Sequence, residues 1–247
     1  MGVDLTDLSL SVDRVIALSK ANKGAYVCVS NVHMCMEAFD SPDFGKVVDQ
    51  ADFVIPDGKP ISVAQKLLGY KDAVQVRGQD IMNALCEISG AKNINIGFYG
   101  GGSDAILDQV KSNLIVQYPD IKITYAFSPP FRPLSDEEDL NVVENINTEK
   151  VDILLVGIGC PKQEIWMAEH KDKVSCVMLG VGAAFDFIAG NKKQAPRWMQ
   201  NSGLEWLFRL SSEPGRLWKR YFKQNPRFVW HFFFQLLKTK FPKIWSQ

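Results

Sequence analysis

The chain has 247 residues, of which 46% are hydrophobic, and it carries 28 basic and 28 acidic residues. This length and apolar content exclude a disordered or fibrous protein and fit one α/β domain with a smaller appendage. The five cysteines are odd in number and show no C-x-x-C spacing, so the sequence favours neither a disulfide framework nor a zinc site, and it indicates a reducing compartment.

Six apolar, strand-like runs alternate with segments of helical period along most of the chain. The runs cover residues 25–30, 52–55, 93–99, 121–127, 152–157 and 175–182. Because they are continuously apolar, they predict a mostly parallel, Rossmann-like sheet with helices on both faces. In the proline-rich stretch 128–140, Ser135 and Glu138 have the spacing of a capping box, so we interpret this stretch as a loop before a helix, not as a domain boundary.

Glycine and polar residues are dense where five of these runs end. They include Ser30, Asn31, Asp57, Gly58, Gly100, Gly101 and the stretches 157–164 and 180–190. Ligands of such sheets bind beyond the carboxyl ends of the strands, where glycines let backbone N–H groups approach a phosphate. The pattern predicts a nucleotide site. The alternative is another kind of nucleotide-binding Rossmann-like enzyme, such as a dehydrogenase. A dehydrogenase should show a G-x-G-x-x-G turn near the N-terminus and an acid about 20 residues later, and both are missing from the sequence.

The charges divide unevenly along the chain. Residues 1–191 contain 16 Lys and Arg against 26 Asp and Glu, whereas residues 192–247 contain 12 against 2. An acidic body therefore carries a basic tail. This asymmetry predicts a polyanionic partner for the tail, either nucleic acid or a membrane surface with its phosphates.

Six stretches occur in an order that characterises a known family. They are "PDG" at 56–58, "RGQD" at 77–80, "GxGxPKQExW" at 157–166, "GVGAAFDFIAG" at 180–190, the segment 195–221 and "NPRF" at 225–228. Together they resemble the WecG/TagA/CpsF family of glycosyltransferases over nearly the whole chain. The resemblance implies an inverting enzyme that moves a hexose, N-acetylhexosamine or uronic acid from a UDP-sugar to a polyprenyl-diphosphate-linked saccharide during cell-surface polysaccharide synthesis. Val29 stands where many relatives have Thr, so a hydroxyl contact there has to come from Ser30 or be absent.

Asp57 is the residue to which the resemblance assigns the role of catalytic base. Inversion needs a carboxylate that takes the proton of the acceptor hydroxyl. From spacing alone, an Asx-type turn with Gly58 explains Asp57 about equally well. Asp80 and Asp186 compete for the role, although "RGQD" also fits a helix cap with a surface arginine and Asp186 fits a cap within its own loop. We expect Arg77 and Asp80 to form a structural or donor-binding pair.

The donor is expected to contact residues at the strand ends and in the family stretches. These residues are Ser30, Asn31, Arg77, Asp80, Gly100, Gly101, Gln163, Gly182 and Asp186. Gln163 follows Pro161 near a helix start, where its amide can bond a uracil edge or a sugar hydroxyl. Lys162 and Glu164 fit a solvated charged face better than a binding role.

No cofactor and no essential metal are expected besides the UDP-sugar donor. The sequence has no D-x-D of the kind that holds a metal on UDP. His33 and His170 lack a second ligand at metal spacing and fit surface or core histidines better.

The basic tail has an amphipathic pattern at residues 216–237, with basic side chains on one side and aromatic and apolar ones on another. Pro226 predicts a break into two short helices. The resemblance implies that Arg209, Arg216, Lys219 and Arg220 bind the acceptor diphosphate. The simpler alternative is a helical pair that packs on the body with solvated lysines.

We therefore predict two parts, a catalytic nucleotide-sugar-binding core at 1–194 and a helical appendage at 195–247. Basic and aromatic residues together suit an anionic membrane surface, whereas a nucleic-acid-binding module gives no use to Asp57 or to the acidic body. No window reaches the length of a membrane span, and the N-terminus lacks the basic and apolar pattern of a signal peptide. The expected location is the cytoplasm, at the inner face of the membrane, and a homo-oligomer is left open.

Overall fold

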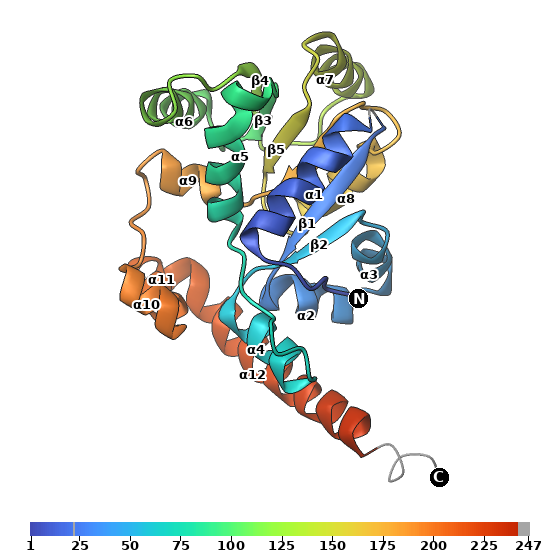
Figure 1. The fold of residues 1–247 in the computed structure, drawn as a ribbon, viewed down its shortest axis with the longest axis vertical. Helices are drawn as coiled ribbons and strands as arrows, with labels where there is room; N and C mark the ends of the chain where they lie inside the picture. The colour runs from blue at the N-terminus through green and yellow to red at the C-terminus, as the bar shows by residue number, and fades with distance from the viewer. Residues whose placement is uncertain (22, 242–247) are drawn as a thin grey trace.

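The computed structural model describes residues 1–21 and 23–241 (Figure 1). The strands are β1 (Ala25–Ser30), β2 (Phe53–Pro56), β3 (Ile96–Gly100), β4 (Ile123–Phe127), β5 (Ile153–Gly157) and β6 (Val177–Gly180). The helices of the body are α1 (Leu8–Lys20), α2 (Val32–Asp40), α3 (Pro42–Asp49), α4 (Lys59–Leu67), α5 (Gly78–Lys92), α6 (Asp104–Gln117), α7 (Asp136–Thr148), α8 (Lys162–His170) and α9 (Ala184–Ile188). The C-terminal helices are α10 (Arg197–Ser202), α11 (Glu205–Ser212) and α12 (Pro214–Lys240).

The strands form one six-stranded sheet in the order β2-β1-β6-β5-β3-β4, and every neighbouring pair is parallel. The predicted α/β class and all the predicted strand runs are confirmed. The third strand starts later than its apolar run because α5 ends at Lys92 and Asn93 takes a left-handed conformation with φ of 55°. Asparagine tolerates this conformation better than most residues do.

Two apolar layers bury the two faces of the sheet. Val27 and Val29 of β1 pack in the layer that contains α1, α5, α6 and α9. Tyr26 and Cys28 of the same strand pack in the layer that contains α2, α3, α7 and α8. Because successive side chains of a strand point to opposite faces, burial on both faces explains why the strand sequences are continuously apolar.

The capping box at the start of α7 is also confirmed. Glu138 N–H donates to Ser135 Oγ at 3.2 Å, and Ser135 N–H donates to Glu138 Oε2 at 2.8 Å. The proline-rich stretch before it is a loop within the body, since β5 follows α7 in the same sheet.

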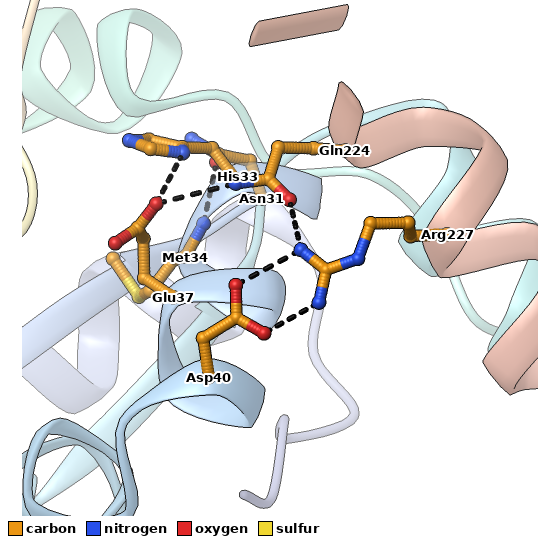
Figure 2. A network of polar contacts seen from close by, with 7 residues as sticks. All are labelled: Asn31, His33, Met34, Glu37, Asp40, Gln224 and Arg227. Carbon is orange, nitrogen blue, oxygen red and sulfur yellow. Dashed lines mark hydrogen bonds and ion pairs between the residues drawn. The ribbon is translucent and has the colours of Figure 1, made fainter. Parts of the chain in front are cut away.

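Helix α12 runs unbroken through Pro226, so the predicted break into two helices is wrong. A proline inside a helix loses one backbone hydrogen bond and clashes with the preceding turn, at a cost of about 3 kcal/mol. Here α2 holds the helix on both sides of the proline (Figure 2). Gln224 Nε2 donates to Glu37 Oε1 at 3.3 Å, and Arg227 makes a bidentate ion pair with Asp40.

The C-terminal helices lie together at one end of the molecule, with α12 beside α2 and α4 (Figure 1). Phe228 of α12 packs with Val32 and Met36 of α2 and with Ile61 of α4. Among the described residues, no helix is both long enough and apolar enough to cross a membrane.

Candidate active site

A cavity of about 190 Å³, here called the sheet-edge cavity, lies at the carboxyl ends of four adjacent strands. Asn31 follows β1, Asp57 follows β2, Gly159 follows β5 and Gly182 follows β6, and all four residues line it. Residues of the C-terminal helices close its other side, namely Gln200, Glu205, Arg209, Glu213, Arg216, Leu217, Arg220 and Tyr221. Body and tail thus build one site.

A second cavity of about 400 Å³, here called the appendage cavity, adjoins the first. The two share Asn31, His33, Asp57, Gln200, Glu205, Arg209, Arg220 and Tyr221. The remaining wall of the appendage cavity is more apolar and includes Val32, Pro60, Trp206, Phe228 and Val229. Asp57 therefore borders both a polar cavity at the sheet and an apolar one under α12.

The end of β2 positions Asp57. Its N–H donates to Ser30 O at 2.7 Å, which extends the pairing of β1 and β2, and Gly58 then turns the chain with φ of 101°. Burial raises the pKa of Asp57 to about 6, and the nearby Glu205 carboxylate acts in the same direction. Arg209, Gln75 and Arg77 act in the opposite direction. A carboxylate with this pKa is ionised at neutral pH and is a stronger base than an ordinary Asp.

Arg77 and Asp80 form an ion pair at the start of α5, with 2.7 Å between Arg77 Nε and Asp80 Oδ2. Arg77 Nη1 also donates to Gln200 Oε1 of α10, and Gln200 Nε2 donates to Ala195 O at 2.6 Å. Both members of the pair line the sheet-edge cavity, so the pair joins the body to the first tail helix at the site.

Gln163 lies at the start of α8, with 3% of its side chain surface exposed, and lines the sheet-edge cavity. Gly159 N–H donates to Gln163 Oε1 at 3.2 Å, and Gln163 Nε2 donates to Glu164 Oε1 at 2.7 Å. The expectation of a solvated face holds for the exposed Lys162 and is wrong for Glu164, which is fully buried. Helix α8 packs on the face of the sheet over β1 and β6, and positions 163 and 164 of its first turn are buried there.

Three arginines of α11 and α12 face the cavities. Arg209 Nη2 pairs with Glu205 Oε1 at 2.5 Å, and Arg216 Nε pairs with Glu213 Oε2 at 2.7 Å. Arg220 is half-buried, and burial, followed by the nearby Arg216, lowers its pKa. Within residues 1–21 and 23–241, no carboxylate forms an ion pair with Arg220. Guanidinium groups in such a cluster suit a diphosphate, because each offers several donors in a plane.

Five residues expected at the site line neither cavity, and these are Ser30, Gly100, Gly101, Asp186 and Lys219. Ser30 is fully buried with its Oγ 3.7 Å from Cys35 Sγ, and its neighbour Val29 lines the sheet-edge cavity.

Three of the other residues outside the cavities, Gly100, Asp186 and Lys219, have structural contacts. A Cβ at Gly100 would lie 2.5 Å from Gly157 O, so this glycine permits close packing of β3 on β5. Asp186 pairs with Lys192 at 2.5 Å, and Lys219 Nζ lies 5.9 Å from the ring centre of Trp218.

Four further residues line both cavities although no sequence pattern indicated them as site residues, namely His33, Gln200, Glu205 and Tyr221. Of these four residues, only Glu205 could have been found from its sequence neighbours. It precedes Arg209 by four residues, which is the spacing of an ion pair on one face of a helix. Burial, followed by the nearby Arg220, lowers the pKa of His33, although Glu37 lies 3.4 Å from its Nδ1 (Figure 2). In the described part of the chain, no group of three His, Cys, Asp or Glu side chains is arranged to hold a metal ion.

A parallel sheet with a half-buried carboxylate and three arginines in one cavity at its carboxyl edge is typical of an α/β enzyme with an anionic ligand. Residues 1–242 match the family described as Glycosyl transferase WecG/TagA/CpsF family, so the chain belongs to this family of glycosyltransferases. The resemblance of the sequence motifs to this family is thereby confirmed.

Two similar relatives are described as N-acetylglucosaminyldiphosphoundecaprenol N-acetyl-beta-D-mannosaminyltransferases. The protein of Bacillus spizizenii is 29% identical over 200 residues, which cover 81% of this chain and 75% of the relative. The protein of Bacillus subtilis is 29% identical over 198 residues, which cover 80% of this chain and 75% of the relative.

Proposed function

We propose that this glycosyltransferase moves a sugar from a UDP-sugar to a saccharide carried on polyprenyl diphosphate, in the synthesis of a cell-surface polymer. The names of the relatives support the acceptor class, since N-acetylglucosaminyldiphosphoundecaprenol is a sugar on a polyprenyl diphosphate. The position of Asp57 between a polar cavity and an apolar one carries the proposal. A two-substrate transfer needs a base where donor and acceptor meet.

In this proposal the UDP-sugar occupies the sheet-edge cavity. Asn31, Arg77, Asp80, Gln163 and Gly182 line it, and the backbone N–H groups of its glycine-rich turns suit a diphosphate. The acceptor saccharide reaches Asp57 from the appendage cavity. Its diphosphate binds among the three arginines where the two cavities adjoin, since Arg209 and Arg220 line both cavities and Arg216 lines the sheet-edge cavity. The first part of its lipid lies along the apolar wall that Trp206, Phe228 and Val229 provide.

The reaction is a single displacement. The acceptor hydroxyl gives its proton to the Asp57 carboxylate as its oxygen attacks the anomeric carbon, and the bond from that carbon to the UDP oxygen breaks on the opposite face. UDP leaves with the electron pair, so the configuration at the anomeric carbon inverts. Preorganised N–H groups and guanidinium groups stabilise the charge that develops on the leaving diphosphate, so we propose that no metal ion is essential.

The outer surface of the tail supports attachment to the membrane that holds the acceptor. Its large exposed side chains outside both cavities include Trp198, Trp218, Phe222, Trp230 and Phe233. Exposed aromatic groups together with lysines and arginines suit the headgroup layer of an anionic membrane. We propose peripheral binding at the inner face, with α12 as the main contact.

A transfer assay with the full chain tests this function. UDP release is measured with a panel of UDP-sugars in the presence and absence of a polyprenyl-diphosphate-linked N-acetylglucosamine in detergent. We expect acceptor-dependent release with at least one donor, and a loss of roughly 100-fold or more in Asp57→Asn. NMR of the product reports inversion, and an EDTA arm reports metal dependence. The absence of transfer from every UDP-sugar, or full activity in Asp57→Asn, would contradict the proposal.

A further inference from the structure

Glu164 is a buried carboxyl group that the proposed mechanism does not use. Its side chain is fully buried, and its Oε1 accepts a hydrogen bond from Gln163 Nε2 at 2.7 Å. Its Oε2 is buried and has no hydrogen-bond partner among the described residues. Burial raises the pKa of Glu164, and its polar neighbours oppose this effect, first the Gln163 side chain and then its own backbone and the Cys160 thiol. Burying a carboxyl group is costly, so a role beyond packing is needed to explain it.

The Gln163 amide is held by two partners of opposite kinds. Gly159 N–H only donates and reaches Oε1 at 3.2 Å, whereas the bonded oxygen of Glu164 accepts from Nε2 at 2.7 Å. Reversing the amide would oppose donor to donor at Gly159 and acceptor to acceptor at Glu164. One N–H and one lone pair of the amide stay available to a ligand in the sheet-edge cavity.

The end of β6 makes room for this arrangement. A Cβ at Gly180 would lie 2.8 Å from Gln163 Nε2, and a Cβ at Gly182 would lie 3.9 Å from Gln163 Oε1. The amide is thus packed closely against Gly180, which lines the same cavity, whereas a Cβ at Gly182 would only reach ordinary contact distance. Close packing together with two directional hydrogen bonds leaves the Gln163 side chain a single orientation.

We propose that Glu164 is a positioning residue for the donor, and that it acts through Gln163. By accepting from Nε2, it determines which end of the amide presents an N–H and which presents a lone pair to the UDP-sugar. This inference rests on the proposed function, because it takes the sheet-edge cavity as the donor site. When residue 164 no longer accepts a hydrogen bond from Nε2, the Gln163 amide is free to rotate. The UDP-sugar then meets an amide without a fixed orientation.

The test compares Glu164→Met with Glu164→Gln in the full-length enzyme. Methionine fills a similar volume without a strong acceptor and removes a buried carboxyl group, so the variant is expected to fold. Glutamine keeps a carbonyl oxygen in reach of Gln163. We expect Glu164→Met to raise the donor KM by roughly tenfold, as for one lost hydrogen bond, while Glu164→Gln stays within about threefold of the parent. The exposed Glu169→Met on the same helix is the matched control and should leave the donor KM unchanged.

A double-mutant cycle separates this role from a structural one. Gln163→Ala should raise the donor KM by a similar factor, and adding Glu164→Met to it should cause no further rise, because the second residue acts through the first. If the increases in donor KM of the two single variants multiply in the double variant, Glu164 does not act through Gln163 and the inference is overturned. The proposed donor site would be unaffected by that result. A lower melting temperature with an unchanged donor KM in Glu164→Met would also overturn it. An unchanged donor KM in Gln163→Ala would overturn the donor placement itself, and this inference with it.

Discussion

Glu205 pairs with Arg209 at 2.5 Å across one turn of α11, and the two side chains are the strongest charged influences on the Asp57 carboxylate. Arg209 lowers the pKa of Asp57 and Glu205 raises it. Both belong to the tail, whereas Asp57 directly follows strand β2 of the body. The tail therefore helps to set the basicity of the proposed base, besides covering the site.

The pH profile tests this relationship. Asp57 must be ionised to act as a base, so with its pKa at about 6 we expect kcat/KM to fall as the pH drops below that value. Glu205→Gln removes a negative neighbour and leaves Arg209 unpaired, and both changes move the acid limb to lower pH. Glu213→Gln is the control, since Glu213 lines the cavity but pairs with Arg216. An acid limb that stays in place in Glu205→Gln would contradict the assignment.

Asp57→Asn should stabilise the fold at neutral and alkaline pH. Folding raises the pKa of Asp57 from 3.8 to about 6, so the folded state favours the protonated carboxyl group. The resulting contribution to the free energy of unfolding is present in full below pH 3.8 and is lost as the pH rises through 6. A shift of this size corresponds to at most about 3 kcal/mol at pH 8. We expect a higher melting temperature for Asp57→Asn at pH 8 than for the parent, and little difference at pH 4. The exposed Asp43→Asn should show no such pH-dependent gain.

The arginines of α12 should act on the acceptor diphosphate, Arg220 from its position in both cavities and Arg216 from the adjoining side of the sheet-edge cavity. Arg216→Ala and Arg220→Ala are expected to raise the acceptor KM by roughly tenfold or more each, because a guanidinium that binds phosphate through charged hydrogen bonds is lost. Lys219→Ala is the matched control. It removes an adjacent positive charge that lies outside both cavities, and it should leave the acceptor KM close to the parent value. Equal losses in all three variants would indicate a general charge effect.

Removal of the tail after Gln194 should abolish transfer without unfolding the body. The sheet is complete at Gly180, whereas Arg209, Arg216 and Arg220 lie beyond the cut. We expect a truncated protein with a cooperative thermal transition and an α/β circular dichroism spectrum, but with little activity on lipid-linked acceptor. Activity equal to that of the whole chain on a membrane-embedded acceptor would assign only a packing role to the tail.

Vesicle binding should depend on both charge and exposed aromatic surface. Each basic residue close to an anionic membrane contributes roughly 1 kcal/mol, which salt screens, so sedimentation with anionic vesicles should fall as salt is added. Phe222→Ser and Trp230→Ser are expected to weaken binding at constant salt, since both side chains are largely exposed on α12. Val116→Ser, at an exposed apolar position of α6, is the control. Binding that is insensitive to salt and to both substitutions would exclude this surface.

Local patterns in the sequence were sufficient for the α/β class, the strand runs and the capping box of α7. They also brought attention to Asp57 and Gln163, because residues at the ends of parallel strands and the starts of helices must meet at one edge of the sheet, whereas Arg77 came from the family motif at 77–80. The family motifs added the three arginines of the tail. These inferences depend on neighbours in sequence or on the topology of a parallel sheet, which the order of the elements already implies.

Contacts between distant segments decided the rest. The sequence of a strand that is buried on both faces does not indicate which of its side chains reach the cavity. Only the packed sheet shows that Val29 lines the sheet-edge cavity and that Ser30 is buried away from it. The burial of Glu164 depends on how α8 packs on the face of the sheet. Pro226 stays within a helix because residues of α2, far away in sequence, hold α12 on both sides of it. In each case the deciding free energy comes from tertiary packing, which local sequence does not encode.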